Sequence, residues 1–285
     1  MNKFSSKIAH EPLQPPEGFL YIPQDNYYLA DLSQVSENGH IEYLYSDGAT
    51  SCIIIIVEGQ SEAKTPLVAL AHLSKKESFD AFFELVNQRF TGGIVVYAQG
   101  ANPPAEHKKG EQEKGLEEDP KEDQQDSYDN AQIVQQWIAQ HLSIVDSKEF
   151  YIREQVLALG EGHPLEANRD CLGINLKTRQ VSNQRFTLTT EQRDEYDGLQ
   201  TLFSLFGHEL HPPLYLRSVS QPFTQEQIIT LVYIAHSYDW TNILGLSDED
   251  MLYYFSTTPH CEVPWFCETL RQSALYVQKH LHLIL

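Results

Sequence analysis

The stretch from residue 46 to residue 72 places the strongest limits on the fold. It contains four consecutive isoleucines and a valine, Ile53 to Val57, and after a polar segment a second apolar run, Leu67 to Ala71. Apolar runs of this length that are rich in β-branched residues and bounded by small or turn-forming residues are typical of buried strands. Because the connection between the two runs is short, we expect two adjacent strands of one sheet.

A cysteine and a histidine stand at matching ends of these two runs. Cys52 begins the first strand, directly after the small-residue turn from Ser46 to Ser51, and His72 ends the second. Adjacent strands would bring the thiol and the imidazole to one edge of the sheet, where the imidazole could take the thiol proton and, as an imidazolium, lower the thiol pKa. Backbone N–H groups of the turn could stabilise an oxyanion. An inert core position is the alternative interpretation, because cysteine is among the most buried residue types.

The charge balance limits the possible partners. Lys and Arg together number 20 against 40 Asp plus Glu, which gives a formal net charge of −20. Nucleic acids and anionic membranes bind basic surfaces, so we expect neither as a partner. The sequence has no run of about 18 apolar residues and no apolar segment behind its N-terminal lysines. With four cysteines outside any disulfide-framework spacing, we expect a cytoplasmic protein, although one exported by a specialised secretion system would show the same pattern.

Strands and helices are expected in mixed order along the chain. Apolar and alternating runs predict strands at 19–22, 27–29, 41–45, 52–57, 67–72, 94–97, 150–159 and 171–176. Apolar residues at three- and four-residue spacings predict helices at 78–90, 131–142, 190–206, 248–255 and 263–282. Three prolines at 212, 213 and 222 predict short extended pieces between them. We therefore expect an α/β (α+β) fold, a layered sandwich of mixed β-sheet with flanking helices in a single domain.

Two segments are expected to lie outside these layers. Residues 1–17 contain three prolines and predict an extended N-terminal arm, which leaves 18–285 as the folded domain. Residues 101–130 hold ten acidic and four basic residues and almost no large apolar ones. Such composition is typical of a solvated, mobile insertion, and we favour that interpretation over a docking role.

The remaining histidines and cysteines do not predict a metal site. His208-Glu209-Leu210-His211 is one residue short of the His-Glu-x-x-His helix of zinc peptidases, and prolines follow it directly. The pair His260-Cys261 and the later Cys267 lack a second cluster that would complete a zinc site. The sequence also lacks a phosphate loop, a dinucleotide fingerprint and a serine-nucleophile elbow. We expect neither a metal nor a cofactor.

Four stretches carry a resemblance to a known family. They are Ser-Asp-Gly-Ala-Thr-Ser-Cys from Ser46 to Cys52, Leu-Ala-His from Leu70 to His72, Gly-Ile-Asn-Leu-Lys-Thr from Gly173 to Thr178, and a C-terminal block from Ser256 to His280. Together they are similar to the eukaryotic protein N-terminal asparagine amidohydrolases, over nearly the whole chain. The Cys/His layout also resembles that of bacterial chemoreceptor glutamine deamidases, which have a hydroxyl residue six positions before the cysteine.

The resemblance implies a monomeric enzyme and a mechanism. Cys52 would attack the side-chain amide of an N-terminal asparagine of a protein or peptide, and water would then resolve the thioester to give aspartate and ammonia. His72 would serve as general base and then as general acid, and Ser46 would orient its imidazole. The alternatives are a deamidase of glutamine or internal asparagine in a folded protein, and a catalytically silent module that binds N-termini.

Recognition of a free N-terminus requires a side chain that binds its ammonium group. Asp47 and Glu262 are the candidates, because both are acidic and lie in matched stretches, although a turn residue and a carboxylate near a helix N-terminus are their simpler interpretations. Ser51, beside the nucleophile, is a third expected substrate contact. Gly48 departs from the family, which has an acidic residue there.

Overall fold

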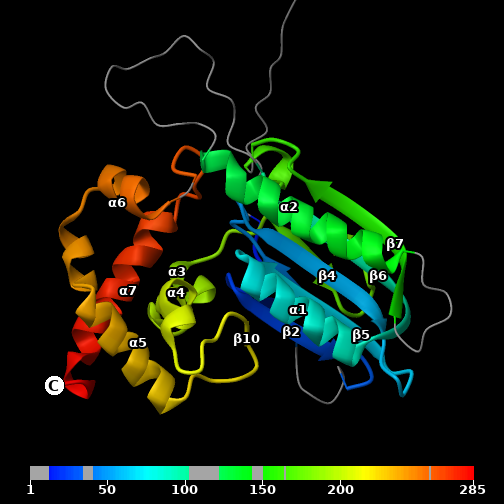
Figure 1. Ribbon diagram of the computed structural model, residues 1–285, viewed down its shortest axis with the longest axis horizontal. Helices are drawn as coiled ribbons and strands as arrows, with labels where there is room; N and C mark the ends of the chain where they lie inside the picture. The colour runs from blue at the N-terminus through cyan, green and yellow to red at the C-terminus, as the bar shows by residue number, and fades with distance from the viewer. Residues whose placement is uncertain (1–12, 35–40, 103–121, 143–149, 164, 257) are drawn as a thin grey trace, which may run out of the picture.

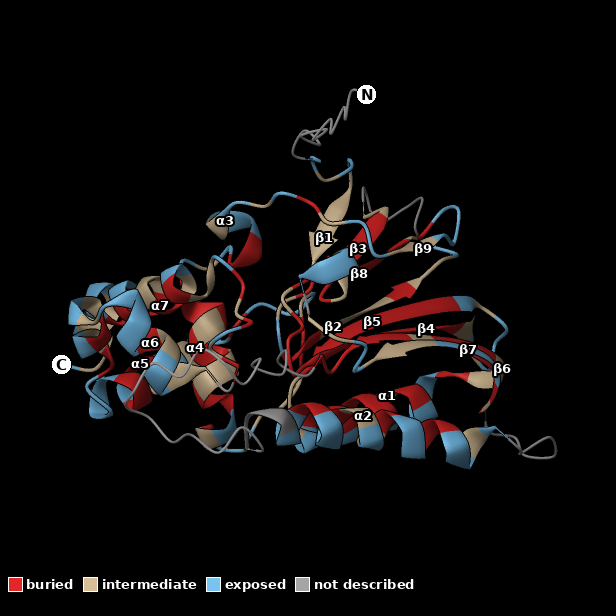
Figure 2. Cartoon of the chain, turned by 90° about the horizontal axis from the view of Figure 1, so that it is seen from above, coloured by how far each residue is buried: buried red, intermediate tan, exposed pale blue. Residues whose placement is uncertain are grey.

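Two stacked β-sheets and a pair of helices form the layered part of the protein (Figures 1 and 2). The structure is a computed structural model that describes residues 13–34, 41–102, 122–142, 150–163, 165–256 and 258–285, with side chains from residue 125 onward in the segment that begins at 122. One sheet has the strand order β1-β3-β8-β9 and the other β10-β2-β5-β4-β6-β7. Both mix parallel and antiparallel pairs. The expected layered α/β sandwich is confirmed.

The bounds of the elements agree with most of the expected ones. The strands are β1 Phe19–Tyr21, β2 Asn26–Asp31, β3 Tyr43–Ser46, β4 Ile53–Gln60, β5 Pro66–Leu73, β6 Thr91–Gly100, β7 Phe150–Leu159, β8 Leu172–Asn175, β9 Val181–Ser182 and β10 Arg217–Ser218. The helices are α1 Lys76–Arg89, α2 Glu122–His141, α3 Thr190–Arg193, α4 Leu199–Phe206, α5 Gln225–Ser237, α6 Asp248–Phe255 and α7 Phe266–His280. Single 3-10 turns occupy Glu166–Asn168, Gly207–Glu209, Trp240–Gly245 and Leu281–Leu283.

Strands β4 and β5 pair as the sequence predicted. They run antiparallel, with Ile54 directly opposite His72. Side chains alternate between the two faces of a strand, so Ile54 and Ile56 point toward the four-stranded sheet while Ile53 and Ile55 point toward α1 and α2. Both faces are buried, which explains why β4 reads as an unbroken apolar run rather than an alternating one.

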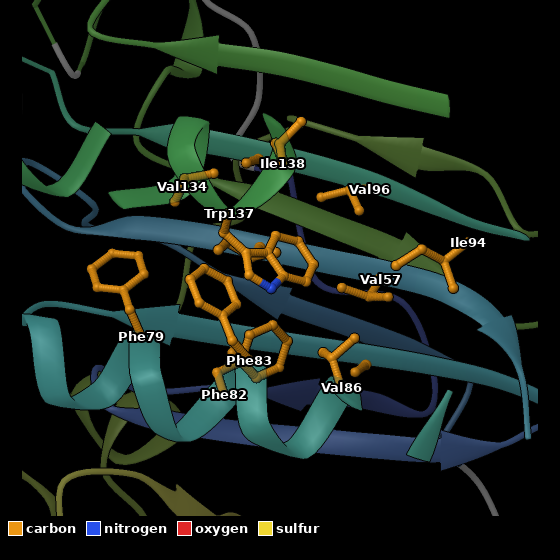
Figure 3. Packing of buried hydrophobic residues seen from close by; sticks show 14 of the residues in the cluster. Val57, Phe79, Phe82, Phe83, Val86, Ile94, Val96, Val134, Trp137 and Ile138 are labelled. Carbon is orange, nitrogen blue, oxygen red and sulfur yellow. The ribbon is translucent and has the colours of Figure 1, made fainter. Parts of the chain in front are cut away.

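Helices α1 and α2 cover the outer face of the six-stranded sheet (Figure 2). The expected apolar stripe of α1 is buried against that face, and α2 adds Val134, Trp137 and Ile138 (Figure 3). The rings of Phe83 and Trp137 stack with their centroids 4.3 Å apart, joining the two helices to each other. This layer holds β4 and β5 rigidly from one side.

The expected solvated insertion at 101–130 is wrong at both of its ends. Ala101 and Asn102 are buried at the end of β6, and residues 122–130 belong to the helix. Small polar side chains make this possible: Asn130 Nδ2 donates to the carbonyl oxygens of Ser51 at 2.9 Å and Ser74 at 3.1 Å. An acidic stretch can thus form a helix with a buried polar face. Residues 103–121 and 1–12 lie outside the described residues.

The remaining helices α4 to α7 pack on a core of their own beside the sheets (Figure 1). The expected helix at 190–206 is present in two parts, α3 and α4, because the chain leaves the helical path between them and Gly198 adopts φ +110°. The carboxylate of Asp194 accepts hydrogen bonds from the N–H groups of Tyr196, Gln200 and Thr201, which stabilises the break. Helix α5 was not predicted, although Thr224 caps it. Ser247 caps the expected helix α6, with its side chain accepting from the Asp250 N–H.

Candidate active site

A cavity of about 360 Å³ lies where the sheets meet the helices. Its lining combines the turn before β4, the end of β5, the start of α4 and the start of α7. Five of the six residues singled out in the sequence line it: Asp47, Ser51, Cys52, His72 and Glu262. Cys52 lies directly before β4 rather than within it, and its side chain faces the layer between the two sheets. The sixth residue, Ser46, ends β3 behind this wall.

Ser46 fixes the tautomer of His72. The Ser46 hydroxyl donates to the Ile22 carbonyl oxygen at 2.6 Å, so its single proton is already used. Its oxygen lies 2.8 Å from His72 Nδ1 and must therefore accept a hydrogen bond from that nitrogen. The Nδ1–H tautomer leaves a lone pair on Nε2, which has no hydrogen-bond partner among the described residues. An unpartnered, buried imidazole nitrogen is an available base.

The register of β4 and β5 places His72 on the same face of the sheet as Cys52. Ile54 is opposite His72, so Cys52, two residues earlier, is its diagonal neighbour on the same face. Diagonal neighbours of an antiparallel pair have Cα atoms about 7–8 Å apart, within reach of long side chains. Both side chains line the same cavity. The fold thus brings the two residues to one face and one cavity, as the sequence led us to expect, and their reaction with each other stays a prediction.

Burial keeps both groups neutral. It raises the pKa of the Cys52 thiol, and the nearby carboxylates of Asp25 and Glu262 raise it further. Burial also lowers the pKa of His72 to about 3. These directions are opposite to those expected for a preformed thiolate–imidazolium pair. The thiol proton would instead pass to Nε2 as the sulfur attacks.

The turn before β4 contains two backbone N–H groups without a hydrogen-bond acceptor among the described residues, both in residues that line the cavity. The turn is held by bonds from Ala49 N–H to the Asp170 carbonyl and from Thr50 N–H to the Gly48 carbonyl, each 3.0 Å. Within the described part of the chain, no group accepts a hydrogen bond from the backbone N–H of Ser51 or Cys52. Two unused donors next to a nucleophile form a candidate oxyanion site.

Asp47 belongs to a buried ion pair. Its carboxylate pairs with Arg193, and the hydroxyls of Tyr21 at 3.0 Å and Tyr45 at 3.3 Å donate to it. The Arg193 guanidinium lies 3.5 Å from the ring centroid of Trp265. With its charge balanced by Arg193 and its oxygens engaged, Asp47 builds the cavity wall rather than offering an open site for an ammonium.

Glu262 is the acid whose charge is not balanced by a cation. Its Oε1 accepts from Ser256 Oγ at 2.5 Å and from Thr258 Oγ1 at 3.2 Å. Among the described residues no Lys, Arg or His forms an ion pair with it, and burial raises its pKa. Of the two acids expected to bind the amine, Glu262 is the one that is not engaged by an arginine among the described residues.

Three further residues of the lining, Asp126, Arg193 and Trp265, were not singled out in the sequence. Asp126 lies within the stretch interpreted as a solvated insertion. Arg193 and Trp265 reach the cavity through the packing of helices on sheets, which no local pattern signals. Among the described residues no cluster of three or more His, Cys, Asp or Glu side chains is arranged to hold a metal ion.

Comparison with known proteins gave no match, either to a family model or to an individual curated sequence. Within the described residues, no helix combines the length and the apolar character needed to cross a membrane. The geometry of the cavity is thus the basis for assigning an activity.

Proposed function

We propose that this protein is a thiol amidohydrolase that converts an N-terminal asparagine of a protein or peptide into aspartate and releases ammonia. The observation that carries the proposal is the fixed tautomer of His72. Ser46 holds the proton on Nδ1, and the Nε2 lone pair is left unpartnered in a cavity that it shares with Cys52. A base with a free lone pair in the same cavity as a thiol supports nucleophilic attack by that thiol.

The chemistry follows from these positions. The Cys52 sulfur attacks the amide carbon while its proton moves to His72 Nε2. The oxyanion that forms is within the reach of the Ser51 and Cys52 N–H groups, each of which is worth about 3 kcal/mol in comparable sites. The tetrahedral intermediate collapses as His72 returns the proton to the leaving nitrogen, and ammonia departs. Water, deprotonated by His72, then cleaves the thioester and restores the thiol.

The charges of the cavity support an amine-bearing substrate. The lining holds four carboxylates, from Asp47, Asp126, Asp194 and Glu262, against a single guanidinium, that of Arg193. Asp47 is neutralised by that guanidinium, and Asp194 is hydrogen-bonded to backbone N–H groups. Asp126 and Glu262 are left, and Glu262 is our candidate partner for a substrate α-ammonium because it is close enough to Cys52 to influence its pKa.

Mass spectrometry of a peptide that begins with asparagine tests the proposal. The wild-type protein should produce the mass shift of amide-to-acid conversion at the first residue, and Cys52→Ala should not. Cys267→Ala is the matched control, because Cys267 is buried in the helical core and does not line the cavity. The acetylated copy of the peptide should not react. Equal conversion by Cys52→Ala would exclude the thiol mechanism, and equal conversion of the acetylated copy would favour a deamidase that ignores the amine.

A further inference from the structure

Successive backbone carbonyl groups around Cys52 are held by hydrogen bonds from outside the turn. The Thr50 carbonyl oxygen accepts from the N–H of Asn102, and the Cys52 carbonyl oxygen accepts from the N–H of Ala101, each at 2.8 Å. Both donors come directly after β6. Backbone bonds thus fix two of three consecutive peptide groups, and the middle one, between Ser51 and Cys52, is held in a different way.

Asn130 on α2 holds this middle peptide group. Its Nδ2 donates to the Ser51 carbonyl oxygen at 2.9 Å and to the Ser74 carbonyl oxygen at 3.1 Å. A side-chain amide nitrogen carries two hydrogens, so these contacts use both of its donors. Ser74 follows the end of β5, two residues after His72. One side chain, only 4% exposed, therefore ties together the segments that carry the thiol and the imidazole.

The bond to the Ser51 carbonyl also decides where the N–H of Cys52 points. The Ser51–Cys52 peptide bond is trans, because within the described residues the one cis bond is that before Pro212. In a trans peptide group the C=O and the N–H point in opposite directions. With the carbonyl directed at Asn130, the Cys52 N–H is directed away from α2. No described residue accepts a hydrogen bond from it, and Cys52 lines the cavity.

A hydrogen bond at the carbonyl also strengthens the donor at the other end of the same peptide group. Linked hydrogen bonds polarise one another, because electron density drawn toward the carbonyl oxygen leaves the N–H more positive. A donor that is fixed before the substrate arrives also needs no reorganisation while negative charge develops. Both effects make the Cys52 N–H a better partner for an oxyanion.

We propose that Asn130 is a positioning residue for the oxyanion site. It orients and polarises the Ser51–Cys52 peptide group, so that the Cys52 N–H stabilises the oxyanion formed from the substrate amide. Asn130 does not itself line the cavity and acts through the peptide group. This inference rests on the proposed function, because it takes the Cys52 sulfur to attack an amide. It makes α2 an element of the site, although the sequence of α2 predicts none of this.

Steady-state kinetics with an asparagine-initiated peptide test the inference. Asn130→Leu keeps the approximate size of the side chain and removes both donors. Its kcat should fall about 10- to 100-fold while KM changes less than about twofold, because the oxyanion is absent from the bound substrate. Ser273→Ala is the control: it removes a buried hydroxyl that donates to the Leu270 carbonyl oxygen in the helical core, and it should keep the wild-type kcat. A wild-type kcat in Asn130→Leu, or an equal loss in Ser273→Ala, would overturn the inference.

Asn130→Asp separates hydrogen bonding from packing, because the two side chains have the same shape. A protonated carboxyl can donate to the Ser51 carbonyl oxygen, whereas an ionised one can only accept. The kcat of Asn130→Asp relative to wild type should therefore fall as the pH rises and the new carboxyl ionises. The relative kcat of Asn130→Leu should not depend on pH. A constant ratio for Asn130→Asp would count against the inference, and this variant decides if Asn130→Leu does not fold.

Isotope labelling gives a readout that needs no turnover. Ser51–Cys52 is the only Ser-Cys pair in the sequence, so ¹³C at serine carbonyls combined with ¹⁵N in cysteine marks this one peptide group in an NMR spectrum. Loss of the hydrogen bond should move its carbonyl resonance upfield in Asn130→Leu and leave it in place in Ser273→Ala. An unmoved resonance in Asn130→Leu would overturn the inference. If wild type converts no peptide, the proposed function fails, and the resonance still decides whether Asn130 polarises the peptide group.

Discussion

The Nδ1 atom of His72 lies 2.8 Å from Ser46 Oγ, and that hydroxyl in turn lies 2.6 Å from the Ile22 carbonyl oxygen. The chain of hydrogen bonds begins at a backbone oxygen, which can only accept, so every proton in it has one possible position. A serine therefore does here what a carboxylate does in a Ser-His-Asp triad: it selects the tautomer. Unlike a carboxylate, it adds no negative charge that would raise the pKa of the imidazole.

Removing the Ser46 hydroxyl should slow the reaction without abolishing binding. In Ser46→Ala the imidazole loses the one hydrogen-bond partner that it has among the described residues and can adopt the inactive tautomer, so kcat should fall about 10- to 100-fold, the range expected for losing one buried hydrogen bond. KM should change little, because Ser46 does not line the cavity. Ser237→Ala, which removes an exposed hydroxyl on α5, is the control for steady-state kinetics. An unchanged kcat in Ser46→Ala would refute the role in selecting the tautomer.

The buried imidazole should make stability depend on pH. Its pKa is about 3 in the folded protein and 6.5 in the unfolded chain, so the unfolded chain binds one more proton between these values. The contribution of His72 to the free energy of unfolding has its highest value above pH 6.5. It falls by about 1.4 kcal/mol per pH unit as the pH drops toward 3. His72→Asn should lack this dependence.

Urea unfolding of both proteins across that pH range measures the effect. Taking the difference between wild type and His72→Asn cancels the opposite contributions of Asp25 and Glu262, whose pKa values are raised by burial. The difference should shrink steadily as the pH is lowered. A difference that stays constant with pH would mean that His72 is protonated equally in both states.

Local pattern was sufficient to predict the strand pair that carries the candidate site. The β-branched run and its partner gave the β4–β5 pair, and the pairing alone brings Cys52 and His72 to one face. The protonation states of Cys52 and His72 could not be predicted, because both pKa shifts come from burial by elements that are distant in the sequence. The sequence suggests that a thiol and an imidazole lie on one face of the sheet, but not that both are buried.

The cavity walls depend on long-range packing. Arg193 and Asp47 are 146 positions apart in the sequence, and no local pattern near either residue predicts that they pair. The break between α3 and α4 was missed because the apolar spacing continues through it, whereas Gly198 needs a positive φ and Asp194 caps the second helix. The buried face of α2 at Asn130 was missed because charge dominates the composition of that stretch.

The Asp47–Arg193 pair should link the turn that precedes Cys52 to the helices, so that the two side chains contribute to stability together. Removing either partner leaves a buried charge unpaired, and Asp47→Asn and Arg193→Met should each cost about 3–5 kcal/mol of unfolding free energy. The double variant should lose much less than the sum of the two, which a double-mutant cycle in urea reveals. The half-exposed pair of Lys177 and Glu42 is the control and should show coupling close to zero. Additive losses at Asp47 and Arg193 would contradict the coupling.

Substitutions at Gly48 can test separately what the backbone of the turn requires at this position and what recognition of the substrate requires. Its φ is +76°, a region in which Asn and Asp are tolerated and β-branched residues are strained. A side chain there would begin 3.7 Å from Val263 and 3.8 Å from Trp265, which is ordinary contact. Gly48→Asn should therefore unfold at a higher urea concentration than Gly48→Val, by about 1 kcal/mol in free energy.

The family that the sequence resembles has an acidic residue at this position, and a second substitution tests whether its charge helps to bind the substrate amine. Gly48→Asp adds a negative charge to the lining next to Val263, on the side of the cavity where Glu262 lies. Because Asp and Asn have the same shape, Gly48→Asp should bind the ammonium of an asparagine-initiated peptide more tightly and show a lower KM than Gly48→Asn, with a smaller difference at high salt. Equal KM values for the two variants would show that residue 48 does not influence recognition of the amine and that its role is confined to the turn.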